Sequence, residues 1–309
     1  AQYGTKVNPD GNLILRNSTY DHNYVGVYVK DLSGGSVIID GTTFSCNDCL
    51  GSSPLKRGYS GQTPGPNVIS FAGIEAYNSI FDIGVSGSAS NIFKDCTRGA
   101  SLENCYNTIV NNTFSDITAG VYYLPLGGYG IFSDMSGGGT LRQLGYGEFS
   151  YSPISFDNCP TAIYAKGGSA SVLSNHMSNV EKGIRIDKIK GQNINASNNL
   201  IVATEKGILL KNNEDAVYVD VNNNTVIINS TLAAGISVFE SVPPSVSRKF
   251  KINCNFVAVD EGIDGILINS ADRINLTQNN ITLNSTVNPA NGIRIQGSSN
   301  CGLLENNVT

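Results

Sequence analysis

The chain has 309 residues, of which 34 are glycine and 15% are charged, and its net charge at pH 7 is −5. The acidic balance and the absence of a basic run argue against nucleic acid as a partner. No apolar run approaches the length of a membrane span, so we expect no membrane insertion.

A repeated pattern runs along the chain from its amino-terminal part onward. An asparagine is followed two residues later by an apolar side chain and, eight residues later, by a glycine. The pairs are Asn91 and Gly99, Asn112 and Gly120, Asn175 and Gly183, and Asn199 and Gly207, with Ser18 in the same place before Gly26. The offset is longer in Asn224 and Gly235, Asn255 and Gly265, and Asn280 and Gly292.

Each glycine opens a segment in which Ile or Val alternates with other residues, and this period of two predicts β-strands. In chain order these segments are 26–29, 73–76, 183–186, 207–210, 235–238, 265–268 and 292–295. The markers are mostly 21 to 31 residues apart. Such short units bury their apolar faces only by stacking, which indicates a solenoid.

Two other solenoids fit the pattern poorly. A left-handed β-helix needs a strict six-residue rhythm, and a leucine-rich repeat needs a Leu-x-x-Leu-x-Leu frame. The sequence instead resembles the right-handed parallel β-helix repeats of the pectate-lyase-like superfamily over nearly its whole length. The resemblance implies an all-β fold of about ten or eleven coils with an asparagine ladder, but that fold hosts lyases, hydrolases, adhesins and phage tailspikes.

The asparagines and glycines have structural roles in this interpretation. Coils stack about 4.8 Å apart, so identical amides donate to one neighbour and accept from the other. We expect buried, stacked side chains at Asn175, Asn199, Asn224, Asn255 and Asn280. Asparagine also tolerates the left-handed backbone of a sharp turn, and glycine allows a tight entry into the next strand.

The chain is predicted to form one domain, 1–309, which we expect to be a segment of a longer polypeptide. Two stretches interrupt the rhythm, at about 46–70 and about 124–148, and are predicted to be loop insertions on one face.

Seven cysteines give an odd count, and Cys46 and Cys49 form a lone Cys-x-x-Cys. With only His22 and His176 as histidines, a zinc site is not supported, and we expect no metal and no cofactor. Buried free thiols and a local disulfide in the loop after Phe44 both remain open.

The residues beside the alternating Ile and Val positions are predicted to point outward. Four tyrosines of this set form a candidate ligand-binding surface: Tyr28, Tyr77, Tyr122 and Tyr164. Aromatic rings on a flat, rigid surface suit the C–H faces of sugar rings. The alternative is that these rings pack beneath the two insertions and hold them in place.

Charged residues of the same set are the candidates for catalysis: Lys166, Arg185, Asp187, Glu75 and Glu103. Paired carboxylates are the groups that glycoside hydrolysis needs. However, the chain has no Asn-Thr-Asp, adjacent Asp-Asp, Gly-His-Gly or Arg-x-Pro-x-x-Arg motif. Asp187 lies between Lys166 and Lys211 on neighbouring coils, so an exposed charge ladder explains it without catalysis. Glu75 and Glu103 are the other carboxylates near the aromatic face.

These observations favour a secreted or cell-surface binding or scaffold module, adhesin-like and not catalytic by itself. Its expected partner is a polysaccharide or another surface protein. The resemblance extends to exported and outer-membrane proteins of Gram-negative bacteria, which implies an extracellular or bacterial surface location. The alternative is a polysaccharide lyase or glycoside hydrolase that acts on an acidic polysaccharide.

Overall fold

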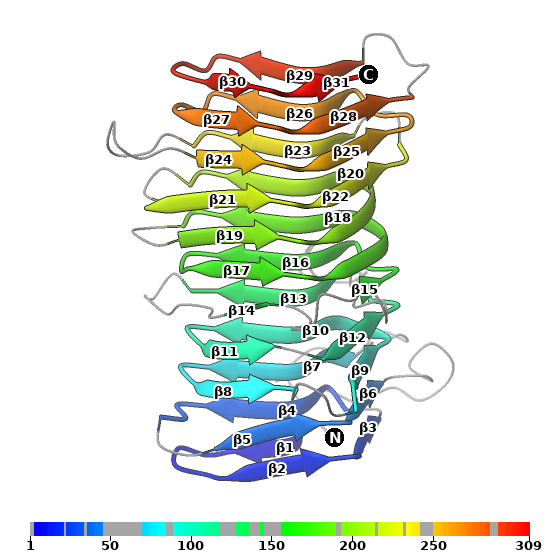
Figure 1. The fold of residues 1–309 in the computed structure, drawn as a ribbon. Coiled ribbons are helices and arrows are strands. Elements are labelled where there is room, and N and C mark those ends of the chain that lie inside the picture. Colours follow the sequence, from blue (N-terminus) through cyan, green and yellow to red (C-terminus); the bar gives the residue numbers. More distant parts are fainter. Residues whose placement is uncertain are drawn as a thin grey trace, which may run out of the picture.

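The molecule is a column of parallel β-strands wound into three faces (Figure 1). Strands of successive coils lie above one another from the amino-terminal end, in blue, to the carboxy-terminal end, in red. This computed structural model describes residues 3–21, 23–33, 36–45, 70–84, 89–109, 111–117, 128–135, 143–144, 156–189, 193–213, 216–230, 233–241, 250–284 and 290–309. Within these ranges there is no helix, and hence none long and apolar enough to cross a membrane.

Face 1 and face 3 belong to one 20-stranded sheet, and face 2 is an 11-stranded sheet. Face 1 contains β1 (Tyr3–Val7), β4 (Val25–Lys30), β7 (Ser70–Tyr77), β10 (Cys96–Glu103), β13 (Tyr129–Asp134), β16 (Thr161–Lys166), β18 (His176–Asp187), β20 (Leu200–Lys211), β23 (Ala234–Phe239), β26 (Asp264–Asn269) and β29 (Asn291–Gln296). The long strands β18 and β20 begin on face 3 and continue onto face 1, which joins the two faces.

The other two faces complete each coil. Face 2 contains β2 (Leu13–Arg16), β5 (Val37–Asp40), β8 (Ile80–Ile83), β11 (Tyr106–Ile109), β14 (Gln143–Leu144), β17 (Ala170–Leu173), β19 (Asn193–Ser197), β21 (Tyr218–Asn222), β24 (Phe250–Asn253), β27 (Ile274–Thr277) and β30 (Gly302–Leu304). Face 3 adds β3 (Thr19–Asp21), β6 (Thr43–Ser45), β9 (Asn91–Lys94), β12 (Asn112–Ser115), β15 (Phe156–Asp157), β22 (Thr225–Ile228), β25 (Phe256–Val259), β28 (Asn280–Leu283) and β31 (Asn307–Val308).

Inward side chains stack into continuous columns along the axis. One column begins with aromatic rings, Tyr20, Phe44, Phe93, Phe114 and Phe156, whose neighbouring centroids are 4.7 to 5.3 Å apart. It continues with the buried side chains of Met177, Ile201, Val226, Val257 and Ile281. Rings and aliphatic groups at one strand spacing pack along the interior, which accounts for the apolar residue two positions after each ladder asparagine.

The asparagine ladder is present, with one correction to the predicted set. Asn175, Asn199, Asn224 and Asn255 are buried, and each donates from Nδ2 to the Oδ1 of the next ladder residue at 2.9 Å. Asn280 is exposed, and Asn279 takes the next place instead.

The residue before each ladder position explains this shift. Asn198, Asn223 and Gln278 have φ near +55°, at 58°, 53° and 54°, so the left-handed turn lies one residue before the ladder and not on it. In Gln278-Asn279-Asn280, the glutamine therefore makes the turn and Asn280 begins β28.

The repeated glycines are required by a close approach between coils. At Gly73 a Cβ would lie 2.5 Å from a ring carbon of Phe93 and 2.9 Å from the carbonyl oxygen of Gly99, in ordinary extended backbone. At Gly130 the corresponding distances are 2.7 Å to Phe156 and 2.7 Å to the next carbonyl. The predicted role, a tight entry into the next strand, is wrong for this series: Gly73 and Gly130 are not in the left-handed region, and they make room for the inward side chain of the following coil.

The predicted insertions differ from the observed strand positions. Strand β7 begins at Ser70, so the first range ends at the start of a strand. Strand β13 lies inside the range 124–148 and pairs with β10 and β16, so that range contains part of a coil. The Gly-Ile pair of Gly130 and Ile131 carries the repeat there, whereas Gly120 lies outside the described residues.

Three of the described cysteines, Cys96, Cys105 and Cys159, are buried free thiols. Burial raises the pKa of Cys96 and Cys159 to about 12 and that of Cys105 to about 11. Cys46 and Cys49 lie outside the described residues.

Candidate functional site

The strand register places the predicted site residues side by side on the outer side of face 1. Tyr28, Glu75, Ser101, Phe132, Tyr164 and Arg185 are successive cross-strand neighbours on β4, β7, β10, β13, β16 and β18. Two residues further along each strand, the neighbours are Lys30, Tyr77, Glu103, Asp134, Lys166 and Asp187.

Eight of the nine predicted residues therefore lie on adjoining strands. The ninth, Tyr122, lies outside the described residues, and Phe132 occupies the position in the register to which Tyr122 was assigned. The sequence signal for Phe132 was the segment GYGIFSD, which repeats the Gly-Ile pattern ten residues after Gly120.

Five aromatic side chains form a ring row, which we define as Tyr28, Tyr77, Tyr129, Phe132 and Tyr164. All five are partly buried. The centroids of Tyr28 and Tyr77 are 5.9 Å apart, and those of Tyr129, Phe132 and Tyr164 are 5.5 Å apart in each pair. These separations are typical of interacting rings. The row extends over β4 to β16 and leaves part of each ring accessible.

Arg98 lies at the centre of the ring row and was not predicted. It is 8% exposed, its guanidinium carbon lies 4.0 Å from the Phe132 ring centroid, and Nη1 donates to Ser101 Oγ at 2.9 Å. Burial lowers the pKa of Arg98, and the charge of Glu75 acts in the opposite direction. Arg98 directly precedes Gly99, as Tyr129 directly precedes Gly130, and the two residues are cross-strand neighbours. The position directly before a repeat glycine is therefore the sequence signal for a second column of outward side chains.

Glu75 and Tyr77 are coupled on β7. The hydroxyl of Tyr77 donates to Glu75 Oε1 at 2.8 Å. Burial raises the pKa of Glu75, while the Tyr77 hydrogen bond and the charge of Arg98 counteract that effect. Burial and the neighbouring Glu75 raise the pKa of Tyr77, so its hydroxyl keeps its proton. Glu103, on the next strand, is exposed.

A second polar cluster lies beside Tyr164. Asp187 is 4% exposed, and its Oδ2 accepts from Arg185 Nε at 3.0 Å, Arg185 Nη2 at 2.7 Å and the Tyr164 hydroxyl at 3.1 Å. The Arg185 guanidinium also lies 4.5 Å from the Tyr164 ring centroid. Burial and Asp187 raise the pKa of Tyr164. Lys166 donates to Asp134 Oδ2 at 2.6 Å on the opposite side.

The predicted exposed charge ladder is wrong for Asp187. The register does place Asp187 between Lys166 and Lys211, but its carboxylate is buried and turns toward Arg185 on its own strand. Arg185 donates to Asp187 Oδ2 from both Nε and Nη2, and its planar guanidinium also lies over the Tyr164 ring, a combination that a lysine does not offer.

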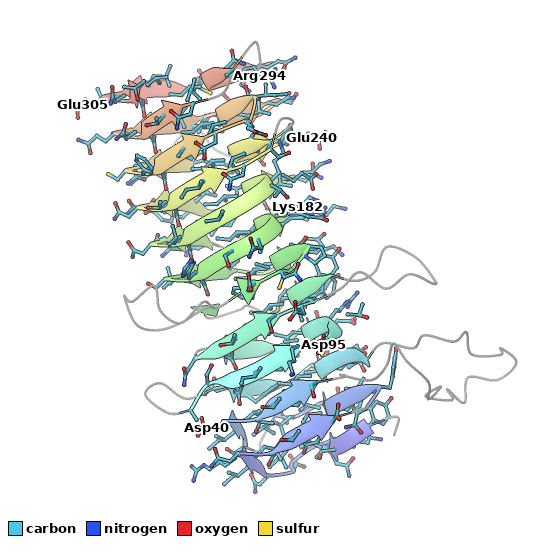
Figure 2. The ribbon with its side chains drawn as sticks, turned by 90° about the vertical axis from the view of Figure 1, so that its right-hand side faces the viewer. Asp40, Asp95, Lys182, Glu240, Arg294 and Glu305 are labelled. Carbon is cyan, nitrogen blue, oxygen red and sulfur yellow. The ribbon has the colours of Figure 1, made fainter. Side chains whose placement is uncertain are left out.

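The carboxy-terminal half of face 1 lacks a ring row. Ser237 and Leu267 point outward in the register but are 0% and 5% exposed. Arg294 Nη2 donates to the buried Asp264 at 2.7 Å. Figure 2 shows Lys182, Glu240 and Arg294 projecting along the side of the column.

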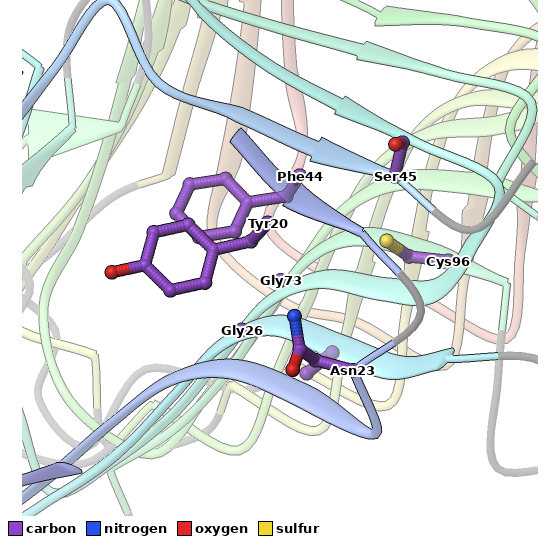
Figure 3. Close-up of a pocket in the computed structure, with 8 residues that line it drawn as sticks. Tyr20, Asn23, Gly26, Phe44, Ser45, Gly73 and Cys96 are labelled. Carbon is purple, nitrogen blue, oxygen red and sulfur yellow. The ribbon is translucent and has the colours of Figure 1, made fainter. Parts of the chain in front are cut away.

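A small pocket lies among the first coils, lined by Tyr20, Phe44, Cys96 and the backbone of Gly26 and Gly73 (Figure 3). It has room for about one water molecule, so it does not suit a sugar or a cofactor. No group of three or more metal-ligating side chains is assembled among the described residues.

Parallel strands in stacked coils, the ladder and the glycine contacts together define the architecture, and a family model described as "Right handed beta helix region" matches residues 98–257. This chain belongs to the right-handed β-helix family. No curated protein and no solved structure matches this β-helix. The family establishes the fold, whereas the chemistry of face 1 depends on the residues that this chain places there.

Proposed function

We propose that face 1 of this β-helix is a carbohydrate-binding surface, with the ring row as its floor. The observation that supports this proposal most is the row itself, five partly exposed aromatic side chains on β4, β7, β13 and β16, with Arg98 of β10 between the two groups. Aromatic rings bury the C–H faces of sugars at low entropic cost, because each ring has only two rotatable side-chain bonds.

The repeat of the scaffold suits a linear polysaccharide. Four strand spacings of about 4.8 Å separate β4 from β16, so the ring row extends for about 19 Å along the axis. A sugar unit of an extended chain has a similar length to one strand spacing. Several consecutive sugars therefore lie over the row, and longer oligosaccharides are expected to bind more tightly until the row is filled.

A polysaccharide ligand favours an extracellular or cell-surface location, where the partner is a polysaccharide or a surface protein that carries one. In this role the β-helix is an adhesin-like binding module and needs no cofactor.

An alanine series tests the proposal. Soluble neutral and acidic polysaccharides are compared for binding to the wild-type chain, Tyr77→Ala and Tyr164→Ala, with thermal unfolding measured in parallel. Tyr218→Ala is the matched control, because Tyr218 is an exposed tyrosine on face 2 that also bonds a carboxylate in its own strand. We expect at least about tenfold weaker binding for the two face 1 variants, the loss of about 1.4 kcal/mol, at a temperature where the unfolding measurement shows each variant to be folded.

The opposite result has a clear meaning. Loss of thermal stability in Tyr77→Ala and Tyr164→Ala, without binding of any polysaccharide by the wild type, would show that the rings hold neighbouring segments in place.

A second candidate function, glycoside hydrolysis, is favoured by Glu75 alone. A carboxyl whose pKa is raised by burial is suited to donate a proton, and Glu103 on the adjoining strand offers a second carboxylate. Release of reducing ends that is abolished in Glu75→Gln would establish this activity. The absence of release, together with polysaccharide binding, would leave the binding module as the function.

A further inference from the structure

We infer that the ligand of the ring row is an electrically neutral glycan, and not one that carries uronate or sulfate groups. The inference rests on the proposed carbohydrate-binding function and names the class of ligand. Its basis is that the charged side chains among the rings occur as cations and carboxylates that already engage one another.

Three cations lie among the rings, and each has a carboxylate beside it. Lys166 is bonded to Asp134 at 2.6 Å, and Arg185 forms a paired contact with Asp187. Arg98 is buried against Phe132 and interacts electrostatically with Glu75. Three cations thus face three carboxylates.

The margins of the row carry both signs of charge. Lys6, on β1, and Lys30, on β4, are exposed beside Tyr28 and Tyr77, and Lys6 Nζ lies 6.0 Å from the Tyr28 ring centroid. Glu103 is exposed on the other side of Tyr77. Lys182, which lies one strand beyond the last ring, forms an ion pair with Glu205. The face 1 cations between β7 and β18 are therefore engaged by carboxylates, and the whole chain carries a net charge of −5. Long-range attraction of an acidic polymer is absent as well.

A uronate or sulfate group is disfavoured at close range. An anion that approaches Arg185 or Lys166 comes beside Asp187 or Asp134, whose negative charge repels it. An anion that drew Arg185 away would leave the Asp187 carboxylate, whose side chain is 6% exposed, as a buried charge without its partner.

Hydroxyl groups are favoured by the same arrangement. Carboxylate oxygens accept several hydrogen bonds, and a hydroxyl donor forms a charge-assisted bond with them. Glu103, exposed beside Tyr77 on the neighbouring strand, is an acceptor of this kind. A neutral sugar thus finds rings for its apolar faces and acceptors for its hydroxyls, without breaking an ion pair.

The test compares neutral polysaccharides, such as xylan and mannan, with polygalacturonate and a sulfated glycan. Binding is measured between about 0.01 M and about 1 M salt, over which the Debye length falls from about 30 Å to about 3 Å. We expect a neutral polysaccharide to bind with an affinity that salt changes little, and the acidic ones to bind much more weakly.

Asp134→Asn provides a second, independent measurement. It releases Lys166, whose side chain is 30% exposed, while the isosteric amide keeps the packing. Affinity for polygalacturonate should rise about two- to fivefold at low salt, the scale of one exposed ion pair, and the gain should disappear at high salt. Asp260→Asn is the control, because it makes the same charge change at an exposed turn after β25.

Each outcome distinguishes this inference from the proposed function. Preferential binding of an acidic polysaccharide by the wild type, with affinity that falls as salt rises, would overturn the neutral-ligand inference and leave carbohydrate binding intact. No binding to either class would overturn both.

Discussion

Replacing Asn199 with leucine would remove the centre of the asparagine ladder. The Asn199 Nδ2 donates to Asn224 Oδ1 at 2.9 Å and to the Val172 carbonyl at 3.0 Å. Its Oδ1 accepts from the backbone nitrogen and from Nδ2 of Asn175, at 3.0 and 2.9 Å. Leucine has a similar size but makes none of these bonds, so the substitution isolates the contribution of the amide.

The expected loss in unfolding free energy depends on which hydrogen-bonding groups still have a partner after the substitution. Asn175 Nδ2 keeps the Leu173 carbonyl, and Asn224 Oδ1 keeps the backbone nitrogen of position 199. The buried backbone N–H of Asn175 loses its acceptor, which costs about 1–3 kcal/mol, and each of two further amide bonds contributes about 1 kcal/mol. The free energy of unfolding should therefore fall by about 3–5 kcal/mol.

Urea unfolding measures this change, and hydrogen exchange at the Asn175 amide reports it locally. The control is Asn280→Leu, because Asn280 is an exposed asparagine one residue from the same ladder. Its effect should stay within about 0.5 kcal/mol, as for most surface positions. A loss below about 1 kcal/mol for Asn199→Leu, or equal losses at both positions, would refute the reasoning that the buried amides stabilise the coils.

Three further predictions concern a repeat glycine, the Glu75 carboxyl and the buried thiols. Gly207→Ala should cost about 1–3 kcal/mol in urea unfolding, since its Cβ would contact Val226 and lie 2.6 Å from the Gly235 carbonyl oxygen. Ala162→Gly, at the equivalent position of another coil, should change stability by only about 0.5–1 kcal/mol, and a neutral Gly207→Ala would contradict the close approach. Burial raises the pKa of Glu75 above its ordinary value of 4.5, so its contribution to stability is complete below that pH and is lost as pH rises through the folded-state pKa. Unfolding free energies measured from pH 4.5 upward should therefore decline less in Glu75→Gln, and identical profiles would argue against a buried carboxyl. In a chain with Cys46 and Cys49 replaced by serine, a thiol reagent should modify the exposed Cys254 quickly and Cys96, Cys105 and Cys159 only on unfolding, because burial raises the pKa of these three thiols. Rapid modification of all of them in the folded state would show that the interior opens.

Local pattern alone determined the architecture. Alternation after each glycine marks strands, and a recurring asparagine marks stacked turns, because both depend on one strand spacing and on the period of a strand. The same alternation placed Tyr28, Tyr77 and Tyr164 on one face with Glu75, Arg185 and the other candidate charges.

At two places the sequence pattern offered two candidate residues for one structural position. The doublet Asn279-Asn280 contains two candidates for one ladder place, and only the left-handed turn at Gln278 selects the first. The glycines at 120 and 130 offer two starts for one strand, and only the pairing of β13 with β10 and β16 selects Gly130.

The chemistry of face 1 depended on the tertiary structure. Sequence spacing placed Asp187 between two lysines, but whether its carboxylate is exposed to water or buried under Arg185 depends on side-chain geometry across neighbouring strands. Arg98 lies within the ring row because β13 places Phe132 against its guanidinium, although the two residues are 34 positions apart in the sequence. Periodicity fixes the side of the sheet from which a residue projects, whereas burial and ion pairing are set by the residues that adjoining coils bring beside it.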